Sequence, residues 1–379
     1  MSGKPKAGGK SIATERLRTL LSDLMMIPGL AGHEGRVRRH LKEQLAALGL
    51  KTRTDMLGNL IATIEGDAAA PSVMLFTHMD QLGFVVRKID ADGYIRVERL
   101  GGVPERALAS QAVVLCVSEG RDRAGVIGNK SHHATTPDEK YRVVPYAELY
   151  VDAGFSSAEE ARAAGIDIGT PVVYRPSVVE LAGERIAGTA VDDRAGCAVL
   201  VEAARALLDA PKKPTVHVVF AVQEEFNLRG ALTAAQVLTP DIAIQIDLLL
   251  AADTPNMGHR GEVRLGAGPG ISLYSFHGRG TLNGTIPHPA LVRLFETTAG
   301  TIGTGLQRSA QTGILTETSY VQLVGGGVAS IDVGFPMRYS HSSLEVCDLA
   351  DLEALTRLLT AAIGGIDASF SLDRDDYET

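Results

Sequence analysis

Cysteine and long apolar runs are both scarce in this chain of 379 residues. The three cysteines, Cys116, Cys197 and Cys347, are an odd number, widely spaced and set among apolar residues. This pattern predicts reduced thiols in the core and argues against disulfides and a cysteine-rich zinc site. No stretch approaches the roughly 20 apolar residues that span a bilayer, and the N-terminus lacks the apolar segment of a secretory signal. We therefore expect no membrane partner and a cytoplasmic location.

An excess of positive charge is absent as well. The chain has 37 Lys and Arg against 45 Asp and Glu, a formal net charge of −8. Nucleic acid and anionic membranes would repel such a chain, so we expect no nucleic-acid partner. Basic residues gather only near the N-terminus, in a short stretch with Gly and Pro, and we interpret residues 1–12 as a disordered basic tail. A hydrophobic content of 45% predicts a globular protein with room for a second domain.

Helix-type and strand-type apolar runs alternate in most of the chain, which is typical of α/β folds. Two helices are expected between residues 13 and 50. Further helices are predicted at 193–208, 230–237, 289–300 and 349–363, and strands at 60–64, 73–76, 216–222, 242–246, 271–276 and 328–333. These elements predict a doubly wound, mostly parallel-sheet catalytic domain assembled from residues 13–80 and 176–379.

Between these two parts, residues 81–175 have a different character. Short β-type runs at 84–89, 94–97 and 112–117 alternate with turn residues, and only 157–164 has a convincing helical pattern. We therefore predict a smaller, mainly β domain inserted into the catalytic domain.

Polar residues interrupt four of the apolar strands. His78, the pair Glu224 and Glu225, and Asp247 come directly after predicted strands, and strand 328–333 leads on to His341. In open α/β sheets ligands bind beyond the carboxyl ends of the strands, so these residues can converge although they are distant in sequence. Imidazole and carboxylate ligands suit zinc first, with cobalt or manganese as alternatives.

A site for two divalent ions needs one carboxylate that bridges them. Asp192, at the start of a predicted helix, is well placed for this. Within the pair Glu224 and Glu225, one carboxylate can bind metal while its neighbour takes a proton from the activated water. Asp80, two residues after His78, is placed to accept the other ring N–H and orient that ligand.

Each of these residues has an ordinary interpretation when taken alone. A histidine after a strand is usually a hydrogen-bonded structural residue, an aspartate before a helix is usually an N-cap, and a glutamate pair can be a solvated strand end. Five such positions at the ends of α/β elements favour metal binding. Five of the remaining histidines show no partner pattern: His33, His40, His259, His277 and His288. His217 is expected to pack within its strand, and for the adjacent His132 and His133 a turn is favoured over an active-site role contributed across the assembly. The chain has no G-x-S-x-G nucleophile elbow.

Several motifs, taken in order, resemble one known family, the tetrahedral and glutamyl aminopeptidases, family forty-two of the metallopeptidases. The motifs are Thr77-His78-Met79-Asp80-Gln81-Leu82-Gly83-Phe84, Val191-Asp192-Asp193-Arg194-Ala195-Gly196, Gln223-Glu224-Glu225, Ile246-Asp247 with Ala252-Asp253-Thr254-Pro255, and Arg338-Tyr339-Ser340-His341-Ser342.

The resemblance implies a role for each residue. Asp192 would bridge two divalent ions, Glu225 and His341 would complete one site, and His78 and Asp247 the other. Glu224 would be the general base. The resemblance also implies that the inserted β domain supports dimerisation, with dimers assembling into tetrahedral dodecamers, and that the substrates are short peptides shortened from the N-terminus.

The chain departs from the family pattern where specificity is set. Phe226-Asn227 follows the glutamate pair in place of Val-Gly, Leu315-Thr316-Glu317 replaces Gly-Thr-Asp, and Ser343 replaces a common proline. We name Asn227, Glu317 and Arg338 as candidate specificity residues. The function expected is that of a two-metal aminopeptidase. A related di-zinc carboxypeptidase or N-acyl amino-acid deacylase and, more remotely, a non-catalytic metal-binding subunit remain as alternatives.

Overall fold

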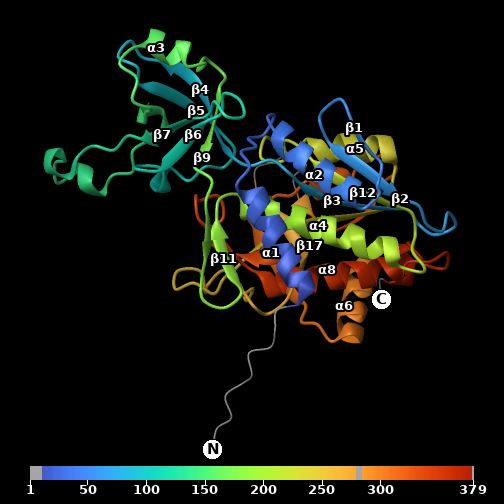
Figure 1. Cartoon of the computed structure of the whole chain (residues 1–379). Coiled ribbons are helices and arrows are strands. Elements are labelled where there is room, and N and C mark those ends of the chain that lie inside the picture. Colours follow the sequence, from blue (N-terminus) through green and yellow to red (C-terminus); the bar gives the residue numbers. More distant parts are fainter. Residues whose placement is uncertain (1–10, 279–283, 378–379) are drawn as a thin grey trace, which may run out of the picture.

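A large α/β part and a smaller β-barrel make up the molecule (Figure 1). The structure is a computed structural model that describes residues 11–278 and 284–377. Helix α1 (Ile12–Met25) is capped by the side chain of Ser11, which accepts a hydrogen bond from the backbone N–H of Thr14. The last two residues of the predicted tail, 11 and 12, therefore belong to the start of this helix, and residues 1–10 lie outside the described residues.

The α/β part is built on one nine-stranded mixed sheet. In spatial order its strands are β1 (Thr52–Thr54), β2 (Leu60–Ile64), β12 (Val216–Ala221), β3 (Val73–His78), β13 (Ile242–Leu250), β17 (Ala329–Met337), β14 (Gly270–Phe276) and β15 (Gly284–Thr285), with β16 (Gln307–Thr312) beside β14. The four central strands β12, β3, β13 and β17 run parallel. The outer pairs β1–β2, β2–β12, β14–β17 and β14–β15 are antiparallel.

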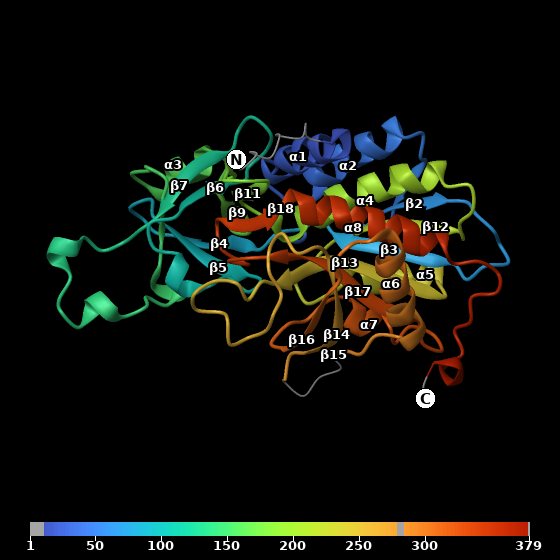
Figure 2. The ribbon, with the colours of Figure 1, turned by 90° about the horizontal axis from the view of Figure 1, so that it is seen from below.

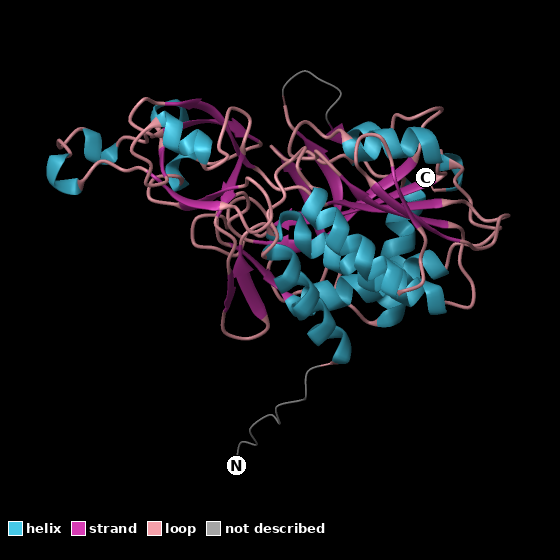
Figure 3. Cartoon of the chain, turned by 45° about the horizontal axis from the view of Figure 1, so that its top comes forward, coloured by secondary structure: helices cyan, strands magenta, loops and turns pink. Residues whose placement is uncertain are grey.

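Apolar side chains on both faces explain why the central strands are buried. In β3, Val73 and Leu75 pack into the main core, whereas Met74 and Phe76 face a second, smaller core. The main core is covered by α1, α2 (Gly35–Ala47), α4 (Val191–Asp209), α6 (Pro289–Ile302) and α8 (Leu349–Gly364). Helices α5 (Gly230–Leu238) and α7 (Thr318–Val321) cover the other face, so helices flank the sheet on two sides (Figure 3).

The barrel has its own core and closes on itself. Its strands, in the order in which they pair, are β4 (Gly83–Ile89), β5 (Ile95–Leu100), β8 (Val151–Asp152), β7 (Arg123–Ile127), β6 (Ala112–Leu115) and β9 (Pro171–Tyr174). Helix α3 (Ala158–Ala163) and the 3-10 turns η1 (Glu105–Ala107) and η4 (Tyr146–Glu148) accompany them. Residues 129–145, with η2 (His132–Ala134) and η3 (Glu139–Tyr141), form an extension that projects from the barrel (Figures 1 and 2).

A third sheet consists of β10 (Val178–Glu180) and β11 (Arg185–Gly188), which follow the barrel in the chain, and β18 (Glu345–Asp348), which follows β17. A last 3-10 turn, η5, covers Arg374–Asp376. Barrel and α/β part are tied by Arg36 on α2, which donates two hydrogen bonds to the carboxylate of Asp122, at 2.5 and 2.9 Å. The barrel is thereby held beside the sheet.

The expected fold class is confirmed: a parallel-centred α/β sheet with helices on both faces, and a smaller β domain. The exact domain limits remain a prediction. All three cysteines are free. Within residues 11–278 and 284–377, the structure has no helix that is both long and apolar enough to cross a membrane.

Candidate metal centre

The candidate site lies where the central parallel strands end. His78 is the last residue of β3, Glu224 and Glu225 follow β12, and β17 leads into the loop that carries His341. Asp247 lies inside β13 and not after its end, because this strand continues to Leu250 beside β17. Pairing of β13 with β3 nevertheless stops at Gln245, so Asp247 sits just past the point where these two strands part.

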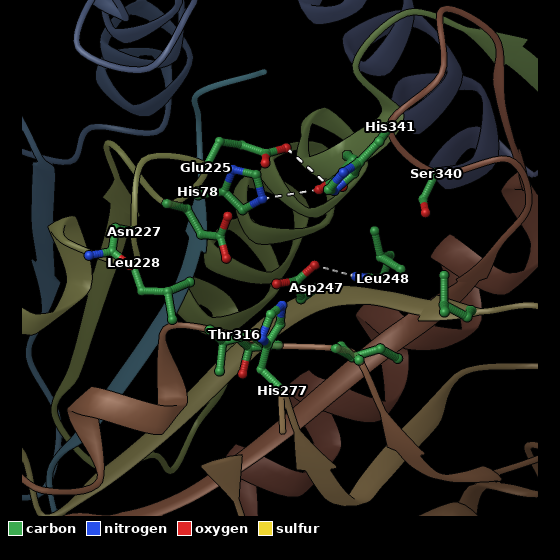
Figure 4. Close-up of a pocket in the computed structure, with 16 residues that line it drawn as sticks. His78, Glu225, Asn227, Leu228, Asp247, Leu248, His277, Thr316, Ser340 and His341 are labelled. Atoms are coloured by element: carbon green, nitrogen blue, oxygen red, sulfur yellow. Dashed lines mark hydrogen bonds and ion pairs between the residues drawn. The ribbon is translucent and has the colours of Figure 1, made fainter. Parts of the chain in front are cut away.

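Two groups of potential ligands share Asp192. His78, Asp192 and Asp247 form one group, and Asp192, Glu225 and His341 form the other. In each group the ligand atoms lie within 4.8 Å of one another. Nε2 of His78 is 3.1 Å from Oδ1 of Asp192, and Nε2 of His341 is 3.5 Å from Oδ2 of the same carboxylate. Figure 4 shows His78, Glu225, Asp247 and His341 pointing toward a common centre. Imidazole nitrogens and carboxylate oxygens in this arrangement fit a pair of divalent cations.

Asp80 supports the glutamate pair. Its carboxylate accepts hydrogen bonds from the backbone N–H groups of Glu224 and Glu225, both at 3.0 Å. The nearest acceptor to Nδ1 of His78 is the main-chain oxygen of Asp80 at 3.2 Å, whereas the carboxylate oxygen lies at 3.5 Å. The carboxylate of Asp80 therefore mainly fixes the loop after β12, and its main chain, more than its side chain, orients the imidazole.

Two supporting residues were not predicted from the sequence. The carboxylate of Glu345 accepts hydrogen bonds from the backbone N–H groups of Asp192 (3.0 Å) and His341 (2.6 Å). Gln245 donates from Nε2 to Oδ2 of Asp247 at 3.0 Å, and its Oε1 accepts from the backbone and hydroxyl of Thr318. A polar glutamine within the otherwise apolar segment 242–246 is the signal that points to Gln245. Glu345 gives no comparable signal.

Several acidic side chains of the site are buried close together, and this raises their pKa values. Burial raises the pKa of Glu224 well above its usual range, and the neighbouring Glu225 and Asp247 raise it further. Burial likewise raises the pKa of Glu225 to about 7 and that of Asp247 to about 8. Burial opposes the charged form of His78, but hydrogen bonds with Asp192 and Asp80 raise its pKa well above the usual value. Acids packed this closely need cations among them to be ionised together.

A cavity of about 400 Å³ opens onto both ligand groups. Besides the ligand-type side chains, its lining includes Glu224, Asn227, Leu228, Leu248, Leu250, His277, Gly313, Ile314, Leu315, Thr316 and Ser340. The sequence interpretation missed His277, which follows β14 and faces the cavity from the side of Thr316 (Figure 4). No periodicity or spacing links His277 to the other site residues, since β14 joins the sheet antiparallel to β17.

The three candidate specificity residues occupy different surroundings. Asn227 lines the cavity, with a positive φ of 74°. Glu317 is fully buried beneath it, and its Oε1 accepts a hydrogen bond from the backbone N–H of Ala231 in the first turn of α5, at 2.6 Å. Arg338 donates two hydrogen bonds to Asp253, at 2.7 and 2.6 Å. The contacts of Glu317 and Arg338 are thus with protein groups.

Fold and site together are those of a metal-dependent aminopeptidase. A family model described as M42 glutamyl aminopeptidase matches residues 58–358, and the chain belongs to this family. The enzyme class follows from membership and from relatives that carry the name aminopeptidase. The carboxypeptidase, deacylase and non-catalytic alternatives are set aside on this ground.

Relatives match nearly the whole chain. SgcX, a putative aminopeptidase of Escherichia coli K12, is 37% identical over 361 residues, covering 95% of this chain and 96% of the relative. The solved aminopeptidase APDkam598 of Desulfurococcus kamchatkensis has a TM-score of 0.88 at 32% identity, covering 97% of this chain and 98% of its own. The TET1 peptidase of Pyrococcus horikoshii, described as assembling into a tetrahedron or a large octahedral shell, has a TM-score of 0.81 at 28% identity, covering 93% and 99%.

Proposed function

We propose that this aminopeptidase works with two divalent metal ions, one held by His78, Asp192 and Asp247 and the other by Asp192, Glu225 and His341. The observation that carries the proposal is the pair of ligand groups that share one carboxylate. Asp192 presents one oxygen to each histidine, which is what a bridging ligand requires. We take zinc as the first candidate, with cobalt or manganese as alternatives.

Glu224 is the proposed general base. It lines the cavity but belongs to neither ligand group. When bound, the ions polarise the scissile carbonyl and lower the pKa of a water toward about 7. The carboxylate of Glu224 takes one proton from this water, whose oxygen attacks the carbonyl carbon. The same proton then passes to the amine as the C–N bond breaks, so the proton balance closes within the site.

Glu224→Gln tests this role. The amide keeps the shape of the side chain but cannot accept the proton, so turnover of amino-acid p-nitroanilides should fall about 10²–10⁴-fold. Metal content, measured by elemental analysis, should stay at two equivalents per chain because Glu224 is not a proposed ligand. Glu43→Gln, at an exposed position on α2, is the matched control. Activity retained in Glu224→Gln, or after removal of metal by a chelator, would contradict the proposal.

The proposed substrates are short peptides with a free α-amino group, from which the N-terminal residue is removed. The family membership supports this reaction, and a buried acidic site suits recognition of a positively charged amine. Comparison of free with N-acetylated peptides tests it: cleavage of the blocked peptides at the same rate would contradict the requirement for a free amine.

We further propose that the enzyme is a homo-oligomer, built from dimers that form through the barrel and assembling into a tetrahedral dodecamer. The likeness to TET1 of Pyrococcus horikoshii supports this. The chain has a mass of 40.0 kDa, so the native mass measured by light scattering should be a large multiple of it. A 40.0 kDa particle at micromolar concentration would contradict assembly. The cytoplasmic location expected from the sequence stays a prediction.

A further inference from the structure

The barrel contacts the candidate metal centre at a pair of glycines directly after β5. The main-chain oxygen of Gly102 accepts a hydrogen bond from Nδ1 of His341 at 2.9 Å. His341 lies on the α/β part, in the loop between β17 and β18. A backbone group of the barrel is therefore the direct partner of a proposed ligand on the other part of the molecule.

Space at these two glycines is very limited. A Cβ on Gly102 would lie 2.8 Å from Nδ1 and 3.0 Å from Cε1 of His341. A Cβ on Gly101 would lie 3.3 Å from Oε2 of Glu225 and 2.7 Å from the Cβ of Leu82. Glycines thus allow the barrel backbone to pack against two of the three side chains of the second ligand group.

The contact also fixes the chemistry of the imidazole. When Nδ1 donates its proton to the Gly102 oxygen, Nε2 keeps a free lone pair. That Nε2 is the atom that faces Asp192 at 3.5 Å and Glu225 at 3.8 Å. The hydrogen bond therefore selects the tautomer and the ring orientation that a metal ligand needs.

The loop that carries His341 depends on such outside support. Both Tyr339 and His341 have positive φ, 61° and 67°, which costs energy in residues other than glycine and persists only where the surroundings hold it. A second contact with the barrel runs from the hydroxyl of Ser343, which donates to Oε1 of Gln111 at 2.8 Å. The barrel therefore holds this loop on both sides of Ser342.

In the other group, His78 and Asp247 are supported by the α/β part and not by the barrel. His78 and Asp247 come from neighbouring strands of the sheet, and both are buried. Their hydrogen-bond partners, the main-chain oxygen of Asp80 and the side chain of Gln245, also belong to the α/β part. The two proposed metal positions thus differ in which part of the molecule supports them.

We infer that Gly102 is a positioning residue for His341, and that the metal position formed by Asp192, Glu225 and His341 depends on the barrel, whereas the position formed by His78, Asp192 and Asp247 does not. The inference rests on the proposed two-metal function. It makes the barrel a structural part of the metal centre, in addition to any role in assembly.

Gly102→Ala tests this inference. The residue does not have a left-handed φ, so alanine is compatible with its backbone, and its methyl group would displace the imidazole. Metal-free protein is titrated with Zn²⁺ by calorimetry and with Co²⁺ by visible absorption. We expect one equivalent to bind as in the wild type and the second to bind about 10–100-fold more weakly. Gly300→Ala, where a Cβ meets no atom within 4 Å, is the matched control and should bind both equivalents normally.

A double variant shows whether the effect passes through the imidazole. In a His341→Ala background, Gly102→Ala should change nothing further, because the group it displaces is already absent. A further loss in that background would overturn the inference. Should Gly102→Ala fail to fold, Gln111→Ala decides: it removes the second barrel contact without adding atoms, and it should weaken the same equivalent.

The outcomes separate the inference from the proposal on which it rests. Wild-type protein that binds fewer than two equivalents contradicts the two-metal function itself. Wild-type protein that binds two, together with a folded Gly102→Ala variant that binds both with unchanged affinity, overturns the positioning role alone.

Discussion

Buried carboxylates that bind pairs of backbone amides hold the site together at the scale of single residues. Asp80 receives the N–H groups of Glu224 and Glu225, and Glu345 receives those of Asp192 and His341. Because each of these side chains accepts two backbone N–H groups, each fixes two proposed functional residues at once.

Replacing one carboxylate oxygen of Asp80 should weaken the hydrogen bonds that position Glu224 and Glu225. Asp80→Asn keeps the shape but turns one acceptor into an NH₂ group that faces a backbone N–H. We expect kcat/KM to fall about 10–100-fold, the usual effect of removing an outer partner of a metal site. Peptidase assays at saturating metal measure this, with Asp92→Asn in an exposed turn of the barrel as control. Wild-type activity in Asp80→Asn would show that these hydrogen bonds are dispensable.

Asn227 and Arg338 should affect substrate preference differently, because only Asn227 lines the cavity. Asn227 lines the cavity, so Asn227→Ala should change the order of preference among substrates with acidic, basic and aliphatic N-terminal residues. Arg338→Ala breaks the pair with Asp253 and should lower kcat/KM for all of them by a similar factor, with the order unchanged. A panel of aminoacyl p-nitroanilides measures both. A changed order in Arg338→Ala alone would reverse this assignment.

Much of the site could be predicted from the sequence because its side chains interrupt apolar strands. The two groups around Asp192 are those that the motifs imply, and the structure brings these side chains together. Gly102 and Glu345 could not be predicted from the sequence because both act through the backbone. Gly102 contributes its main-chain oxygen, and Glu345 binds backbone N–H groups. Neither contact leaves a pattern of polar and apolar residues in the sequence.

At the scale of elements, long buried strands and helices could be predicted and short edge strands could not. Strands β3 and β12 and helices α4 and α8 match apolar runs whose length and period define them. Strand β13 extends to Leu250, further than predicted, because Gly334 lets β17 approach closely: a Cβ there would lie 1.9 Å from the main-chain oxygen of Asp247. Short strands such as β1 and β15 owe their form to neighbours in the sheet, which local sequence does not reveal.

The start of α8 carries a buried acid that makes folding sensitive to pH. Asp351 accepts hydrogen bonds from the backbone N–H groups of Gly266 and Gly268, yet burial raises its pKa from 3.8 to about 6. The folded state therefore binds the proton of Asp351 more tightly than the unfolded state does, and protonation of Asp351 stabilises the fold. This contribution to the free energy of unfolding is complete below about pH 4 and is lost as the pH rises through 6.

Asp351→Asn removes this titration. The stability of the wild type relative to the variant should therefore fall between pH 4 and 7, by on the order of 3 kcal/mol, and stay constant above. Thermal midpoints of both proteins, recorded across this range in one buffer series, measure the effect. A difference that does not vary with pH would contradict it.

At the scale of the whole molecule, metal should stabilise the fold. Ions that bind only the folded chain add about 2.7 kcal/mol per site at a hundredfold excess over Kd, hence roughly 5 kcal/mol for two sites. Removing metal with a chelator should lower the thermal midpoint by several degrees, and Zn²⁺ should restore it. The variant His341→Ala should recover only part of this stabilisation. An unchanged midpoint after verified metal loss would contradict the coupling of metal binding to folding.

The contact between Gly102 and His341 also bears on when the enzyme becomes active during its synthesis. The barrel emerges from the ribosome before His341 does, and the loop that carries His341 needs both the barrel and β17 in place. A nascent chain that stops before this loop contains all three residues of the proposed His78 group but lacks His341 of the other group. If the two-metal proposal holds, turnover should therefore begin only after residue 341 has been made and has packed against the barrel.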